Sequence, residues 1–171
     1  MTYSIRLFCE ADAPRLAALT HAAITAIGPH SYSPAQVAAW ANRHQTAERF
    51  VTRAANGVQV WVAIDATNDP AGYALLEVDE HSHGHLDMLY CHPDHTRRGL
   101  ANRLLASAES NACKAGIARL YTEASELARP AFERAGYVVM HRRDFDIGSA
   151  GQPIPIHNYA MEKLLDRAAP A

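Results

Sequence analysis

The sequence is poor in cysteine, and its three cysteines are far apart, with no Cys-x-x-Cys pair: Cys9, Cys91 and Cys113. Small domains that depend on disulfides carry an even number of cysteines at close, regular spacings. This odd and scattered set therefore predicts no structural disulfides, and it favours a reducing compartment, the cytoplasm.

An excess of either charge is also missing, because 16 Lys and Arg face 18 Asp and Glu, for a formal net charge of −2 at pH 7. Such a balance gives no global argument for binding nucleic acid or an anionic membrane. No apolar run approaches the ~18 residues of a membrane span, and the first residues lack the charged-then-apolar order of a signal peptide. We expect a cytoplasmic protein in which any binding of anions is local.

Internal repeats, linkers and low-complexity segments are absent from the chain of 171 residues. Its composition, 49% hydrophobic and 20% charged, is that of a folded globule and not of a disordered chain. The length suits one core. We therefore predict a single domain over residues 1–165, followed by a frayed tail over residues 166–171.

The spacing of apolar residues predicts an alternation of strands and helices along the chain. Strands are expected at residues 3–8, 58–65, 71–79, 86–91, 117–122, 137–146 and 156–164. Helical segments are expected at residues 14–27, 34–40, 46–55, 97–114 and 128–135. In the strand over 86–91, Leu86, Met88 and Tyr90 alternate with their neighbours and should share one face. The helix that follows should place the next strand parallel to this one.

A basic loop separates this strand from its helix. A His-Pro-Asp turn ends the strand at residues 92–94, and Thr96 is the expected N-cap of the helix. Arg97, Arg98 and Gly99 then stand where a helix leaves its first backbone N–H groups unpaired. Free donors, the positive end of the helix dipole, guanidinium groups and a residue without a Cβ together predict a phosphate-binding loop.

The order of strand, turn, basic loop and helix resembles motif A of the GCN5-related N-acetyltransferases (GNAT). That family carries Gln/Arg-x-x-Gly-x-Gly/Ala after a His-Pro-Asp-like turn. The matching positions here run from Thr96 to Ala101; Gly99 and Ala101 agree, and Thr96 replaces Gln or Arg.

A second segment, residues 125–137, resembles motif B of the same family, usually Asn-x-x-Ala-x-x-Phe-Tyr-x-x-x-Gly-Phe. Ser125 replaces the Asn and Phe132 replaces the Tyr, whereas four positions agree: Ala128, Glu133, Gly136 and Tyr137. The resemblance implies an α+β acyl-CoA N-acyltransferase fold, with a mixed, mostly antiparallel sheet of six to seven strands and about four helices.

The resemblance also implies an acetyl-CoA-dependent acetyltransferase without a metal, acting on a primary amine in a ternary complex. Backbone N–H groups after the strand would hold the pyrophosphate, and the strand itself would lie along the pantetheine arm. The residues implied in binding acetyl-CoA are Leu89, Tyr90, Cys91, Thr96, Arg97, Arg98, Gly99, Leu100, Ala101, Asn102, Ser125, Ala128 and Phe132.

Three groups are candidates for the chemistry. The backbone N–H of Leu89 would polarise the acetyl carbonyl. Asp87 is the first candidate for the general base, because an acid inside an apolar strand is costly unless it is paired or used; the alternative is a carboxylate on the solvent face or one paired with an arginine such as Arg119. His85 is the second candidate. The usual tyrosine acid is missing, since Phe132 has no hydroxyl.

For the amine acceptor, the candidates are Tyr32, Trp40 and Tyr159, although Trp40 lies on an apolar helix face and is also a natural core residue. Two other functions compete with catalysis. One is a CoA-binding module without activity, and the other is a metal site built on His81, His83 and His85, which are followed by Cys91, His92 and His95. Partners beyond acetyl-CoA and the amine are not expected, apart from a second copy in a homodimer.

Overall fold

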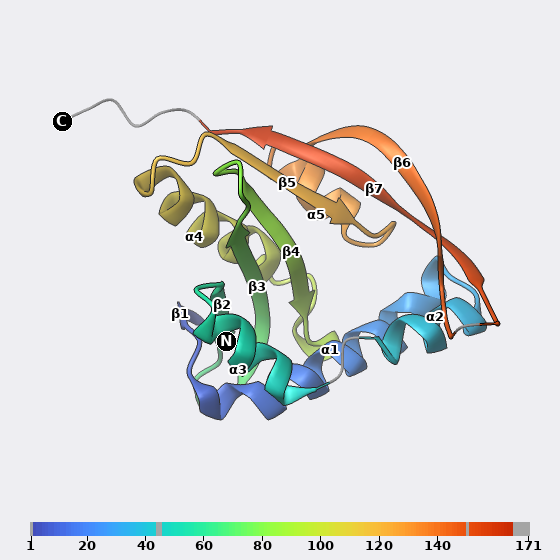
Figure 1. The fold of residues 1–171 in the computed structure, drawn as a ribbon. Helices are drawn as coiled ribbons and strands as arrows, with labels where there is room; N and C mark the ends of the chain where they lie inside the picture. Colours follow the sequence, from blue (N-terminus) through green and yellow to red (C-terminus); the bar gives the residue numbers. More distant parts are fainter. Residues whose placement is uncertain (1, 44–45, 150, 166–171) are drawn as a thin grey trace.

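The computed structural model describes residues 2–43, 46–149 and 151–165, and one seven-stranded sheet runs through its centre (Figure 1). The strands lie in the order β1 (Ser4–Leu7), β2 (Gln59–Ile64), β3 (Pro70–Val78), β4 (Gly84–Cys91), β5 (Arg119–Ala124), β7 (Ile154–Leu164) and β6 (Val138–Ile147). Among the strand pairs of the described residues, only β4 and β5 are parallel. The predicted mixed sheet and its parallel pair are confirmed. The tail predicted at residues 166–171 lies outside the described residues.

In the described part of the chain, five α-helices cover the sheet, one at each of the five helical segments predicted from the sequence. They are α1 (Ala13–Ile27), α2 (Pro34–Ala41), α3 (Ala47–Ala55), α4 (Leu100–Lys114) and α5 (Arg129–Arg134), with short 3-10 turns at residues 10–12, 28–30 and 93–95. A capping box between Ser33 and Gln36 begins α2 as a helix separate from α1. None of the helices in the described part of the chain is long and apolar enough to cross a membrane.

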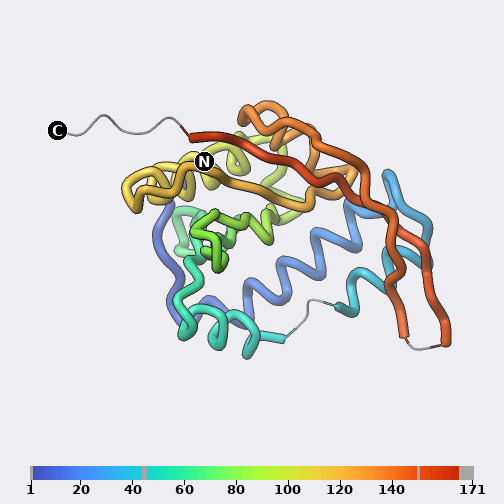
Figure 2. Tube along the Cα trace, turned by 45° about the horizontal axis from the view of Figure 1, so that its top comes forward, coloured from blue at the N-terminus to red at the C-terminus, as the bar shows by residue number. Residues whose placement is uncertain are grey.

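The helices divide between the two faces of the sheet. Leu104 and Leu105 of α4 pack in the clusters that hold Ala74 and Leu86. Leu16 of α1 packs on the other face, in the cluster that holds Val62 and Leu75. Figures 1 and 2 show α4 and α1 on these two sides of β3 and β4. Both faces of the central strands are therefore buried.

A β-bulge interrupts β4 at Asp87. Leu75 of β3 is opposite Met88, and the next residue, Leu76, is opposite Leu86, so Asp87 has no partner on β3. Leu86 consequently packs under α4, whereas Met88 packs under α1. The prediction that Leu86, Met88 and Tyr90 share one face was therefore wrong for Leu86, because the extra residue shifts the alternation by one.

Next to the bulge, β4 and β5 separate. Their parallel pairing consists of Gly84 with Leu120 and His85 with Tyr121, although both strands continue beyond these positions. Figure 1 shows the two strands diverging, with the long β6–β7 hairpin reaching over to α2 at the wide end. There Ile147 and Ile156 of the hairpin pack with Val37 of α2. A hydrophobic contact thus closes the far side of the opening.

An ion pair fixes the start of α1 to β1. Arg6 donates two hydrogen bonds to the carboxylate of Asp12, at 2.7 and 2.9 Å, and the N–H of Cys9 donates a third at 2.9 Å. Asp12 is only 3% exposed. Burial alone would raise the pKa of Asp12, but the hydrogen bonds from Arg6 and Cys9 outweigh it and lower the pKa below the ordinary 3.8.

Replacing Asp12 with Asn should lower the free energy of unfolding by about 2 kcal/mol at pH 7, because hydrogen bonds to a charged group are lost. Because the pKa of Asp12 is lower in the folded protein than in the unfolded chain, its ionised carboxylate stabilises the fold at any pH above the unfolded-state pKa. This stabilisation disappears as the pH falls through the folded-state pKa. The difference between the two proteins in urea denaturation should therefore shrink between pH 5 and pH 3. Asp69→Asn is the control, since Asp69 and its partner Arg15 are both 59% exposed. An Asp12→Asn effect independent of pH would contradict this account.

Candidate active site

Two cavities occupy the opening between β4 and β5. The first has a volume of about 400 Å³ and extends from the end of β4 to the start of α4. The second has a volume of about 450 Å³ and extends toward α2, α3 and the β6–β7 hairpin. The residues that line both are Trp40, Leu89, Tyr90, Ser125 and Ala128. The two cavities therefore meet at the end of β4, and we name them the loop cavity and the hairpin cavity.

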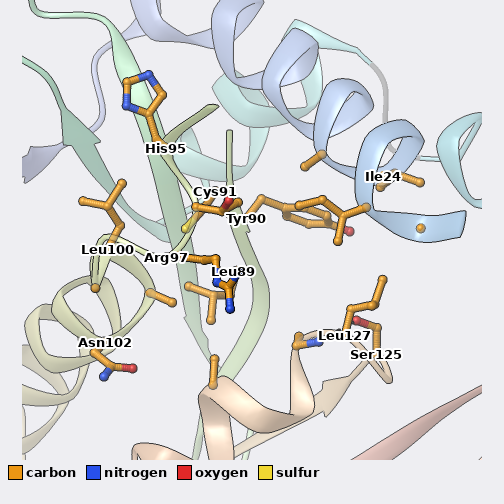
Figure 3. Close-up of a pocket in the computed structure, with 18 of the residues that line it drawn as sticks. Ile24, Leu89, Tyr90, Cys91, His95, Arg97, Leu100, Asn102, Ser125 and Leu127 are labelled. Atoms are coloured by element: carbon orange, nitrogen blue, oxygen red, sulfur yellow. Dashed lines mark hydrogen bonds between the residues drawn. The ribbon is translucent and has the colours of Figure 1, made fainter. Parts of the chain in front are cut away.

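The start of α4 forms one wall of the loop cavity. Gly99 precedes the helix with a left-handed φ of +74°, and Arg97 has a φ of +60°. Figure 3 shows Arg97 between Leu89 and α4, with Asn102 on the first turn of the helix. Of the sequence-predicted cofactor residues, those that line this cavity are Leu89, Tyr90, Cys91, Thr96, Arg97, Gly99, Leu100, Ala101, Asn102, Ser125 and Ala128.

The prediction that Thr96 caps α4 was wrong. The helix begins at Leu100 with Gly99 as its N-cap, and the Thr96 hydroxyl donates instead to the carbonyl of Pro93 at 3.0 Å. Arg97 and Gly99 have a left-handed backbone, which turns the chain between Thr96 and the helix. The N-cap therefore lies at Gly99, three residues after the predicted position. The basic pair thus belongs to the loop, where it precedes the first helical turn.

Two other predicted cofactor residues lie outside the lining of the loop cavity. Arg98 donates to the hydroxyl of Tyr3 at 3.2 Å and to the carbonyl of Asp94 at 3.1 Å. Phe132 is 2% exposed, packs edge-on against Tyr137 and lines the hairpin cavity. Their contribution to cofactor binding stays a prediction.

Asp87 lines the hairpin cavity and is paired with an arginine that the sequence did not suggest. Its Oδ2 accepts a short hydrogen bond from Arg53 of α3, and the other amino group of Arg53 donates to Glu77 at 2.8 Å. Arg119, the partner considered from the sequence, binds Glu162 instead. The Oδ1 of Asp87 has no hydrogen-bond partner among the described residues. One carboxylate oxygen thus remains able to accept a hydrogen bond in the cavity.

Glu123 of β5 is the second carboxylate of the hairpin cavity. Its Oε2 lies 2.7 Å from Nε2 of His85, and its Oε1 lies 3.4 Å from Arg143. The hydrogen bond from His85 is the main cause of a lowered pKa at Glu123. Both oxygens of Glu123 therefore have cationic neighbours.

His85, the second candidate base, lines neither cavity. Its ring stacks on Tyr121 at 4.6 Å, and Nδ1 lies 3.2 Å from Glu77. Burial alone would lower the pKa of His85, but the hydrogen bonds with Glu123 and Glu77 and the nearby charge of Asp87 raise it overall. His85 can thus reach the hairpin cavity only through Glu123.

The predicted acceptor residues are placed differently from one another. Trp40 and Tyr32 line the hairpin cavity, although the Tyr32 hydroxyl already accepts from the N–H of Glu126 at 2.8 Å. Tyr159 lines neither cavity, because its hydroxyl donates to Glu126 at 2.6 Å and its ring lies under Arg129. An acceptor contact from Tyr159 stays a prediction.

The histidines that suggested a metal site have separate partners. His83 lies 3.6 Å from Asp79, whereas His85 binds Glu77 and Glu123. Over residues 2–43, 46–149 and 151–165, no group of three or more His, Cys, Asp or Glu residues is placed to hold a metal ion.

Comparison with known proteins identifies the family. An acetyltransferase (GNAT) domain family matches residues 29–156. The chain is 35% identical over 133 residues to YafP, an uncharacterized N-acetyltransferase of Escherichia coli K12, covering 78% of this chain and 79% of YafP. A crystal structure of a GCN5-related N-acetyltransferase from Rhodopseudomonas palustris is 30% identical with a TM-score of 0.82, covering 96% of this chain and 97% of that one.

The PaiA N-acetyltransferase of Thermoplasma acidophilum, solved with coenzyme A, has the same fold at 18% identity, with a TM-score of 0.77 over 96% of this chain and 100% of that one. The chain therefore belongs to the GNAT family of acetyltransferases, as motifs A and B predicted, and it is an acetyl-CoA-dependent acyltransferase.

Replacing Gly99 with Ala should weaken CoA binding about 10-fold, measured by calorimetry, because a left-handed residue with a Cβ distorts the loop that approaches the phosphates. Gly116→Ala is the matched control. Gly116 ends the same helix with a φ of +79°, and a Cβ at either glycine would meet nothing within 4 Å. Both variants should lose about 1 kcal/mol of unfolding free energy, and equal losses of CoA affinity would contradict the assignment of the loop.

Cys91 should react slowly with iodoacetamide even though it lines the loop cavity. Burial raises the pKa of Cys91 to about 11, from an ordinary value of 9.0, so little thiolate is present at pH 8. We expect Cys91 to be alkylated about 10-fold more slowly than the exposed Cys9. Mass spectrometry of the two cysteine-containing peptides measures both rates. Faster modification of Cys91 would reveal an activated thiol that this environment does not explain.

Proposed function

We propose that this acyltransferase moves the acetyl group of acetyl-CoA to a primary amine, which attacks the thioester directly while both are bound. The observation that carries the proposal is the meeting of the two cavities at Leu89, Tyr90 and Ser125. A thioester reaching this junction from the loop cavity would meet an amine entering from the hairpin cavity. Proximity of this kind supplies much of the rate of a bimolecular reaction.

The loop cavity suits a nucleotide cofactor with phosphate groups. The first N–H groups of α4 and the Arg97 side chain border it, and a helix start of this kind favours anions. The rest of its lining is mostly apolar, with Ile24, Leu127 and Ala131 on the walls, which suits the pantetheine arm. The coenzyme A bound to PaiA, a protein of the same fold, supports this assignment.

Because β4 and β5 part, the β5-facing edge of β4 has no ladder partners beyond His85 among the described residues. The N–H of Leu89 remains our candidate donor to the thioester oxygen, where negative charge develops during attack. In the transfer, the amine nitrogen forms a bond to the acetyl carbon, the carbon–sulfur bond breaks, and coenzyme A leaves as the thiolate. Water is our candidate for protonating the thiolate, since position 132 carries no hydroxyl.

The amine must lose a proton before it can attack. We assign this step to Asp87, because its Oδ1 is unpartnered among the described residues while Arg53 holds Oδ2. Glu123 is the weaker candidate, since His85 and Arg143 occupy both of its oxygens. His85 then acts as a positioning residue for Glu123. A homodimer and residence in the cytoplasm stay predictions.

Asp87→Asn should lower kcat/KM about 100-fold or more in a screen that follows thiol release across a panel of amines, because a general base contributes that much. Glu123→Gln should lower it less. Asp144→Asn is the matched control, since Asp144 lies exposed on β6 and pairs with Arg142. Thermal stabilisation by CoA should persist in all three variants, which shows that each is folded.

Full activity of Asp87→Asn at every pH would overturn the assignment of the base. CoA binding without thiol release from any amine would instead identify a binding module without catalysis and overturn the proposed function.

A further inference from the structure

The hairpin cavity holds an unusual set of charges. Two acids, Asp87 and Glu123, line it together with three arginines: Arg43, Arg49 and Arg143. A cavity that receives a cationic amine has an obvious use for the acids. The arginines need a separate explanation, because positive charge beside the acceptor would repel a simple amine.

The acids do not account for all of these arginines. Asp87 is neutralised by Arg53 of α3, which lies outside the hairpin cavity, and Glu123 is neutralised by His85 and Arg143. Neither Arg43 nor Arg49 has a carboxylate within 4 Å in the described part of the chain. The one hydrogen bond between them joins the Arg49 guanidinium to the carbonyl of Arg43, at 3.5 Å.

Both of these arginines are exposed to solvent as well as lining the cavity. Arg49 and Asp87 also line a shallow groove along α3, whose other lining residues are Thr46, Glu48, Thr52, Arg53 and Glu77. Arg43 lies two residues after the end of α2 and Arg49 lies in α3, so both arginines belong to the helical side of the opening. Leu89 and Ser125, which line both cavities, mark the place where the hairpin cavity meets the loop cavity. Arg43 and Arg49 thus bring positive charge without a carboxylate partner to a cavity whose two acids already have cationic partners.

We propose that the acceptor is an amine that also carries an anionic group, a carboxylate or a phosphonate, which Arg43 and Arg49 bind while the amine reaches Asp87. The inference rests on the proposed function. The volume of about 450 Å³ suits a molecule of amino-acid size, and Trp40, Phe145 and Ile156 provide an apolar wall for its body. Guanidinium groups bind carboxylates and phosphonates in paired hydrogen bonds, whereas they disfavour a polyamine.

Acceptor pairs that differ only in the anionic group test this directly on the unaltered protein. Suitable pairs are L-phenylalanine with 2-phenylethylamine and L-arginine with agmatine. In the third comparison, β-alanine and 2-aminoethylphosphonate are each paired with ethylamine. The anionic member should have a kcat/KM at least 10-fold higher in one or more pairs, and the third pair distinguishes a carboxylate from a phosphonate. Equal or better activity of the neutral member in every pair would overturn the proposal.

Variants locate the effect. Arg43→Gln and Arg49→Gln should each lower kcat/KM for the preferred anionic acceptor about 10- to 100-fold, mainly through KM, and by less than about 3-fold for its neutral partner. Arg15→Gln is the control, because Arg15 is exposed and pairs with Asp69. Unchanged CoA affinity verifies the fold of each variant. Equal losses on both members of a pair would also overturn the proposal.

The two proposals fail in different ways. If no amine releases thiol from acetyl-CoA, the proposed function is wrong. If neutral amines react as well as anionic ones and neither Arg43→Gln nor Arg49→Gln alters the preference, only the inference about the acceptor is wrong. An anion preference that survives in both variants would place the anion site elsewhere and overturn the role of these arginines.

Discussion

The separation of two parallel strands is the constraint on which this structure depends. β4 and β5 pair at only two positions and then part, so a sheet of seven strands contains an opening in its middle. Backbone groups at the edges of such an opening need other partners. The hydroxyl of Thr122 supplies one by donating to the carbonyl of Leu86 at 2.7 Å. The remaining edge of β4 is then available to a bound ligand.

The same opening explains the charges around it. A chain of alternating acids and cations runs across β3, β4 and β5: Arg53 joins Asp87 to Glu77, and His85 joins Glu77 to Glu123. Isolated charges at partly buried positions would be expensive, and this pairing removes most of that cost. It also holds two carboxylates at fixed places beside the cavity. Arg143 adds a further cation at Glu123, whereas Arg43 and Arg49 take no part in these pairs and are the arginines that we assign to the acceptor.

The fold and the cofactor loop could be predicted because their signals are local. The strand, the turn and the basic glycine loop follow one another within residues 85–105, and a second motif at residues 125–137 supports them. Local signals were less reliable where the backbone departs from regular geometry. The bulge at Asp87 reversed one face assignment, and the left-handed residues Arg97 and Gly99 moved the start of α4 past Thr96.

The order of elements, the parallel crossover and the family were determined by the sequence itself, because hydrophobic periodicity and turn chemistry act between neighbouring residues. The partners of the charged groups were decided only by the tertiary structure. Arg53 is 34 positions from Asp87, and His85 is 38 positions from Glu123. Nothing in the local pattern of α3 distinguishes Arg53 from Arg49, yet packing places Arg53 on the carboxylate of Asp87 and Arg49 in the lining of the hairpin cavity. Ion pairs between distant elements depend on that packing, and so does the set of arginines that line the hairpin cavity without a carboxylate partner.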